Sequence, residues 1–314
     1  MVLIVVHFLS ISIDKVTKIH AEQIADDDPR APLLPADRLN EVHYEMDVAD
    51  AWNMNVFLKG EPKSKRRKRG FTHGALYESL FGGYYEIDHR LMGDVDIIVN
   101  DVNTRSISCM KIRSAAADKS LMDRVVELGE SMPTKGNCRR DVGDLGDMFA
   151  VGYRSKAREL VYKQTRNERT KQAMILLSKE VVPFLRTHYR EVLADIQMAE
   201  QAGAKVPALL EMGGVEGPGG SIMISRNLGN SSHYDNSDGS NSCAIWAETQ
   251  VGMASNWYFV LPNMSINGSK GAVIKLRHGV SISWDGRIIR HCSSVTAVGG
   301  TNNVYGCMFG SCRD

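Results

Sequence analysis

The sequence lacks a strong net charge, an apolar run of transmembrane length and a Cys-x-x-C pair. Its 38 basic and 37 acidic side chains leave a formal net charge of +1, so the molecule as a whole gives no electrostatic reason for a nucleic-acid or membrane partner. The six cysteines are scattered without metal-ligand spacing, which argues against a structural zinc site and a disulfide framework. Reduced cysteines are typical of an intracellular protein, nuclear or cytoplasmic.

The N-terminal run MVLIVVHFLSIS (1–12) is apolar but too short to span a bilayer. It also lacks the positively charged start and the small-x-small cleavage site of a signal peptide. We therefore expect neither secretion nor a membrane partner. With 314 residues, of which 43% are hydrophobic, the chain can bury a sizeable core.

Changes of composition divide the chain into three parts. Residues 1–70 are expected to be irregular or mobile, because they include a Pro-rich, acidic stretch at 21–41. Residues 71–203 are expected to form a mixed, mainly helical scaffold, with apolar residues at helical spacing and Pro183 dividing the longer helical stretch. Residues 204–314 are expected to form a jelly-roll core that binds a metal ion.

A basic run lies near the end of the first part. Its six cations, within seven residues, are Lys63, Lys65, Arg66, Arg67, Lys68 and Arg69. Such a run can be a solvated loop, or it can serve as a nuclear-localisation signal or contact nucleic-acid phosphates. Aromatic residues are not interleaved with the charges, so the run would supply non-specific attraction and no base stacking.

After residue 203 the apolar residues gather in short runs separated by Gly, Ser and Asn, as strands separated by turns do. The runs are SIMISRNL (221–228), SCAIWAET (242–249), NWYFVLPN (256–263), AVIKL (272–276), VSISW (280–284) and VYGCMFG (304–310). Six short strands in about 90 residues predict an antiparallel barrel or a jelly roll. The fold class is therefore α+β, a C-terminal double-stranded β-helix (jelly roll) preceded by a helical N-terminal region.

The stretch SSHYDNSDGSNS (231–242) places a histidine and a carboxylate two residues apart, between two predicted strands. In extended backbone, His233 and Asp235 lie on the same side and can face one ion. A third ligand should come from a later strand end, and His291 fits better than His278, because strand 280–284 leads back toward the first pair. Two histidines and one carboxylate are the facial triad of non-haem Fe(II).

These residues resemble the 2-oxoglutarate/Fe(II)-dependent dioxygenases over about residues 220–312. The resemblance is carried by HYD (233–235), the strands AIWAE and NWYFVLPN, and GVSISWDGRIIRH before the distal histidine. It implies Fe(II) held by His233, Asp235 and His291, with 2-oxoglutarate as co-substrate. It also implies an oxidoreductase that hydroxylates a C–H bond of its substrate while 2-oxoglutarate is decarboxylated to succinate. The sequence does not identify the substrate.

Members of that family usually carry Arg or Lys about ten residues after the distal histidine, where it pairs with the far carboxylate of 2-oxoglutarate. In this chain the stretch AVGGTNNVYGCMF (297–309) has no basic residue, and a neutral amide does not replace an Arg–carboxylate pair in kind. The candidate contacts to the co-substrate are therefore Arg313 and Lys275, followed by Tyr258 and Asn303.

Two other functions fit the same residues. A jelly roll can be a non-catalytic binding module whose histidines are ordinary loop residues, and the chain could instead be a nucleic-acid-binding protein that uses the 63–69 run. A calcium loop does not fit DNSDGSN, because its acidic residues do not alternate and no Glu closes the loop. A serine hydrolase does not fit either, since no G-x-S-x-G elbow is present.

Overall fold

The computed structural model describes residues 16–23, 82–101, 105, 107–134, 136, 145–153, 161–201, 209–230, 232–235, 238–254, 257–294 and 302–312. Its strands are β1 (Thr17–Gln23), β2 (Tyr85–Ile87), β3 (Val95–Asp101), β4 (Ile107–Ser114), β5 (Leu145–Gly152), β6 (Ser221–Gly229), β7 (Asp238–Glu248), β8 (Tyr258–Leu261), β9 (Met264–Ser265), β10 (Ala272–Lys275), β11 (Val280–Trp284), β12 (Cys292–Ser293) and β13 (Val304–Cys312). Its α-helices are α4 (His89–Met92), α5 (Lys119–Glu130), α6 (Glu168–His188) and α7 (Arg190–Gln201), and its 3-10 helices are η2 (Lys163–Arg166) and η3 (Leu209–Met212).

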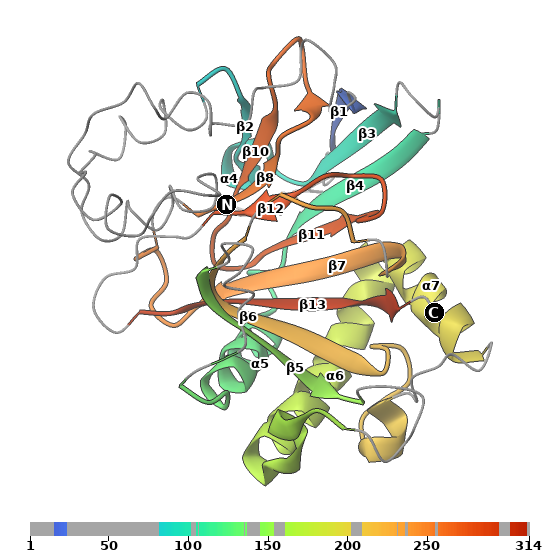
Figure 1. The fold of residues 1–314 in the computed structure, drawn as a ribbon, viewed down its shortest axis with the longest axis vertical. Helices are drawn as coiled ribbons and strands as arrows, with labels where there is room; N and C mark the ends of the chain where they lie inside the picture. Colours follow the sequence, from blue (N-terminus) through green and yellow to red (C-terminus); the bar gives the residue numbers. More distant parts are fainter. Residues whose placement is uncertain are drawn as a thin grey trace, which may run out of the picture.

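The described strands form two sheets (Figure 1). The larger sheet has the order β5-β6-β13-β7-β11-β4-β3-β1-β9, and the smaller sheet has the order β12-β8-β10-β2. Six of these strands, β6, β7, β8, β10, β11 and β13, coincide with the six apolar runs of the sequence after residue 203. The pattern of short apolar runs between turn residues therefore predicted these strands correctly.

Successive C-terminal strands alternate between the two sheets. From β6 in the larger sheet, the chain crosses to the smaller sheet, where His233 forms an isolated bridge beside β12, and it returns to the larger sheet as β7. It crosses to the smaller sheet again for β8 and β10. It then runs through β11 in the larger sheet, β12 in the smaller sheet and β13 in the larger sheet. This alternation is the connectivity of a double-stranded β-helix, or jelly roll. Residues far apart in the sequence, such as 233 and 291, are thereby brought to neighbouring backbone positions.

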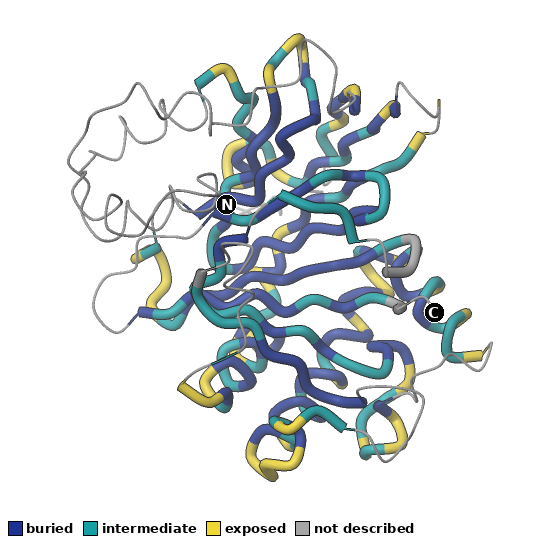
Figure 2. The backbone as a smooth tube through the Cα atoms, viewed as in Figure 1, coloured by how far each residue is buried: buried dark blue, intermediate teal, exposed yellow. Residues whose placement is uncertain are grey.

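Two apolar clusters fill the layers of the fold. One lies between the two sheets and includes Trp246, Phe259, Ile274 and Trp284. The other lies between the larger sheet and helices α5, α6 and α7, which cover one face of that sheet (Figure 1). The central strands are buried on both faces for this reason, and Figure 2 shows them as a continuous buried layer.

Side-chain caps mark the first turns of α5 and α6. The Asp118 carboxylate accepts a hydrogen bond from the Leu121 amide at the start of α5, and Asn167 caps α6 in the same way. The expectation that Pro183 divides the helical stretch was wrong, because α6 continues through it to His188. The break falls at Tyr189, whose φ of −141° and ψ of 56° are not helical.

The N-terminal half contributes more strand than its composition predicted. Thr17–Gln23 lies in the part expected to be irregular, yet it forms β1, which pairs in parallel with β3. Strands β3, β4 and β5 likewise extend the jelly-roll sheet, so the core is not confined to the C-terminal part and the region before it is not simply helical. All three parts of the predicted division, 1–70, 71–203 and 204–314, contribute strands to the larger sheet.

The basic run 63–69, the apolar run 1–12 and Arg313 lie outside the described residues, so the expectations for them stay predictions. Among the helices that the structure describes, none combines the length and the apolar character needed to cross a bilayer. The four described cysteines, Cys109, Cys243, Cys292 and Cys307, are all free thiols.

Candidate metal centre

The backbone brings the two histidines together across a pair of antiparallel segments. His233 and His291 form an isolated bridge, in which the amide of each residue donates to the carbonyl of the other, at 3.0 and 3.1 Å. Residues that exchange both hydrogen bonds in this way carry their side chains on the same face. The imidazole rings accordingly lie 4.7 Å apart between centroids.

A separate backbone hydrogen bond fixes the position of Asp235. The Asp235 amide donates to the carbonyl of Gly286 at 2.8 Å, and Gly286 lies in the turn that follows β11. A Cβ atom on Gly286 would lie 2.7 Å from Asp235 Oδ2 and 2.9 Å from Asp235 Cβ. The turn therefore carries a glycine at the point where the carboxylate needs the space.

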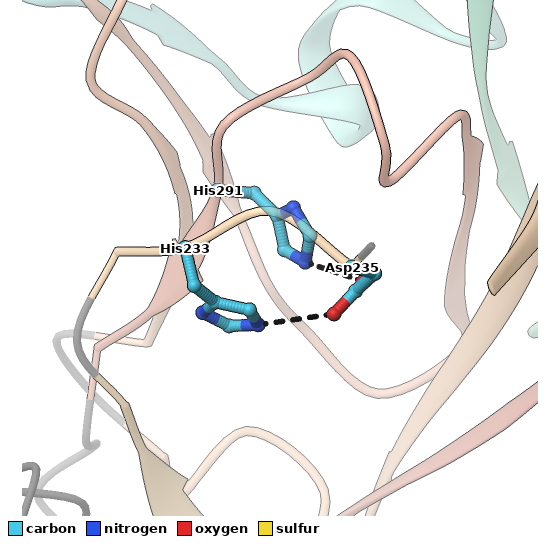
Figure 3. A group of neighbouring side chains, drawn as sticks. All are labelled: His233, Asp235 and His291. Atoms are coloured by element: carbon cyan, nitrogen blue, oxygen red, sulfur yellow. Dashed lines mark ion pairs between the residues drawn. The ribbon is translucent and has the colours of Figure 1, made fainter. Parts of the chain in front are cut away.

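Figure 3 shows the three side chains pointing toward one another. Asp235 Oδ1 lies 3.3 Å from His233 Nε2, and Asp235 Oδ2 lies 3.1 Å from His291 Nε2. One ligand atom from each residue lies within 4.8 Å of the others. Adjacent ligands of one octahedral ion lie about 3 Å apart when each bond is about 2.1 Å long, so this spacing suits a shared metal ion.

The charges of the site also suit a cation. Burial alone would raise the pKa of Asp235, but hydrogen bonds and positive charge from His233 and His291 in their protonated state outweigh it and hold that pKa well below its usual range. The carboxylate is thus an anion at neutral pH. Its Oδ2 atom is buried and has no hydrogen-bond partner of good geometry, and a buried charged oxygen in that state is costly unless a cation meets it.

The tautomer of His291 strengthens this conclusion. Its Nδ1 atom lies 2.9 Å from the carbonyl of Ile289; because a carbonyl only accepts, Nδ1 carries the proton. Neutral His291 therefore has its lone pair on Nε2, which faces Asp235 Oδ2. Two lone pairs at 3.1 Å repel unless a proton or a metal ion lies between them. A carbonyl that fixes the far nitrogen in this way is the usual support of a metal-binding histidine.

Sequence reasoning missed the aromatic residues around His291. The ring of Phe259 stacks on it at 5.3 Å with an interplanar angle of 17°, and the ring of Trp284 meets it edge-on at 5.2 Å and 63°. Trp284 lies in the segment GVSISWDGRIIRH, but its contact with His291, like that of Phe259, follows from the pairing of β8 with β12 and from the end of β11. Trp246 and Trp257 are buried core residues, as their type suggested.

Among the described residues, the predicted co-substrate contacts Tyr258, Lys275 and Asn303 do not gather at the triad. Because Phe259 faces His291, strand alternation turns its neighbour Tyr258 to the opposite face of β8. Lys275 pairs with Tyr258 across the sheet, which puts it on that opposite face too, and its Nζ lies 3.7 Å from Glu86 Oε1. Burial and the negative charge of Glu86 raise the pKa of Tyr258 to about 12.

The side chain of Asn303 has another partner, because its Oδ1 atom accepts a hydrogen bond from the side-chain amide of Asn227 at 2.9 Å. The competing histidine, His278, accepts a hydrogen bond from the Glu248 amide through Nδ1 at 3.2 Å, and it is not among the three clustered ligands. The structure therefore groups His291, and not His278, with His233 and Asp235, the arrangement that strand geometry favoured.

No protein-family model and no curated protein matches this sequence. Among solved structures, NgTET1 in complex with 5mC DNA is 14% identical over 69% of this chain and 76% of its own, with a TM-score of 0.43. A prolyl hydroxylase from Trichoplax adhaerens, in complex with a hypoxia inducible factor peptide fragment, is 12% identical over 64% and 83%, with a TM-score of 0.34. A 2OG-Fe(II) oxygenase family oxidoreductase from Burkholderia pseudomallei is 13% identical over 72% and 91%, with a TM-score of 0.31.

These similarities concern the fold alone. Because the identities and TM-scores are low, the function is inferred from the geometry of the triad and not from these proteins.

Proposed function

We propose that this protein is an Fe(II)- and 2-oxoglutarate-dependent oxygenase that hydroxylates a C–H bond of its substrate. The observation that carries the proposal is the convergence of His233, Asp235 and His291 within 4.8 Å, with Asp235 Oδ2 buried and without a hydrogen bond of good geometry. Two imidazoles and one carboxylate are the ligand set of non-haem Fe(II) sites, which leave coordination positions open. Bound there, iron would activate O₂ as 2-oxoglutarate is decarboxylated to succinate.

The chain's own residues have distinct tasks in this function. Asp235 supplies the negative charge, and the Gly286 carbonyl holds its backbone in place. His291 presents Nε2, because the Ile289 carbonyl holds the proton of Nδ1. The His291 side chain is only 5% exposed, whereas the His233 side chain is 27% exposed, so a substrate would reach the ion from the side of His233.

The co-substrate needs a basic residue that pairs with its far carboxylate. Tyr258 and Lys275 lie on the face of β8 and β10 that is turned away from His291, which leaves Arg313 as the basic candidate. The proposal keeps 2-oxoglutarate because the jelly roll and the triad are the features in which the sequence resembles the 2-oxoglutarate/Fe(II)-dependent dioxygenases. An Arg313→Ala variant tests whether this residue holds the far carboxylate.

Anaerobic titration with Fe(II) and 2-oxoglutarate tests the proposal. The chelate of the two gives a weak charge-transfer band in the visible region, and His233→Ala and His291→Ala should both abolish it. His278→Ala is the matched control, since this histidine lies outside the triad. Iron binding without the band would remove 2-oxoglutarate from the proposal, and absence of iron binding would favour the non-catalytic binding module.

A further inference from the structure

The imidazole of His291 is held on three sides. Its Nδ1–H donates to the Ile289 carbonyl, the face of Phe259 covers one face of the ring, and the edge of Trp284 meets the ring at 63°. The indole nitrogen of Trp284 is buried and has no hydrogen-bond partner. Trp284 therefore acts on His291 through packing, whereas the Ile289 carbonyl acts through a hydrogen bond to Nδ1.

Phe259 is itself fixed in place. It packs against Trp284 at 5.0 Å and against Trp246 at 5.8 Å, and it is 3% exposed. The backbone of Phe259 pairs with Ser293, two residues beyond His291, so both rings lie on the inner face of the small sheet. The stacked arrangement is consequently a property of the folded jelly roll and does not depend on a bound ion.

Stacking at this position has an electrostatic consequence. An imidazole that gives its lone pair to a divalent cation becomes more positive, and the face of an aromatic ring carries negative potential. The Phe259 ring thus stabilises His291 more when the metal is bound than when it is absent. It also excludes water from that side of the ligand, which strengthens the local electrostatic interactions.

The geometry points to Phe259 as a positioning residue for the metal: by stacking on His291 it raises the affinity of the site for a divalent cation without touching the ion. This inference rests on the proposed function, because it requires that the triad binds a metal. It adds a residue that the ligand pattern does not contain. It also gives the two histidines unequal roles, His291 being held rigidly by its neighbours.

Mn(II) binding by isothermal titration calorimetry tests this role in the full-length chain. Phe259→Leu and Phe259→Met remove the ring but keep an apolar side chain, and either should weaken Mn(II) binding roughly tenfold or more, the usual effect of losing an outer support of a ligand. Phe259→Tyr keeps the ring and should restore the affinity. Phe309→Leu is the matched control, because Phe309 is fully buried in the cluster on the helix side of the sheet.

A second readout separates positioning from a general loss of packing. In the Zn(II)-loaded protein, the ring ¹⁵N signals of His291 should be sharp in the wild type and Phe259→Tyr, and broadened by ring motion or partial metal release in Phe259→Met. Wild-type affinity in both ringless variants would overturn the inference and leave the proposed function standing. Absence of Mn(II) and Fe(II) binding by the wild type would overturn both.

Discussion

Gly286→Ala tests how closely the turn after β11 is built around the metal ligand. The new Cβ would lie 2.7 Å from Asp235 Oδ2, whereas ordinary contact begins at 3.4 Å, so the carboxylate has to move by about 0.7 Å. Gly286 is not among the glycines with positive φ, so alanine is compatible with its backbone. The strain falls on Asp235, because the Cβ atom of Asp235 would also lie only 2.9 Å from the new Cβ atom.

A displacement of that size should weaken divalent-metal binding roughly 10- to 100-fold, as loss of ligand support does at other sites. Overpacking should cost about 1–3 kcal/mol of folding free energy. Mn(II) calorimetry and chemical denaturation measure the two effects separately. Gly310→Ala is the matched control, because its Cβ would lie 2.9 Å from Ser242 Oγ and not against a ligand. Wild-type metal affinity in Gly286→Ala would refute the reasoning.

Three further variants test the charges and hydrogen bonds. Asp235→Asn should abolish the rise in melting temperature that Mn(II) gives the wild type, measured by calorimetry; an unchanged rise would exclude Asp235 as a ligand. Burial opposes ionisation of Asp88, but its hydrogen bond to Arg277 at 2.6 Å holds its pKa below the usual value. The stability that ionised Asp88 contributes is present above about pH 4 and is lost as pH falls through the folded-state pKa. In urea titrations, Asp88→Asn should therefore destabilise the protein at pH 7 and much less at pH 3. Equal effects at the two pH values would contradict this. Ser281→Ala should cost about 1–3 kcal/mol in the same titrations, because it leaves the Tyr189 hydroxyl buried without its 2.8 Å partner; a change near zero would show that the bond contributes little.

The C-terminal strands could be predicted because their signal is local. Short apolar runs with turn residues between them identify strands directly, and the runs at 242–249 and 280–284 became β7 and β11. The N-terminal contribution was missed for the opposite reason. VDIIVND alternates as a half-buried strand does, but its place in the large sheet depends on pairing with Thr17–Gln23, far away in the sequence. Register between distant segments is set by tertiary packing, which periodicity does not report.

The candidate site divides in the same way. His233 and Asp235 share one extended segment, so their common direction follows from backbone alternation alone. Phe259 and Gly286 carry no chemistry that marks them in a sequence, and they became recognisable only when β8 and the turn after β11 were placed beside the triad. Tyr258 was predicted as a contact from its residue type. Strand β8 (YFVL) is buried on both faces, so its sequence does not show which of its side chains point toward the triad.

The stoichiometry of Fe(II) binding under anaerobic conditions tests the central claim most directly. Wild-type protein and His278→Ala should each bind one Fe(II) per chain, and His291→Ala should bind none at the same concentrations. Retention of tight, one-to-one binding by His291→Ala, or absence of binding by the wild type, would show that the triad is not a metal centre.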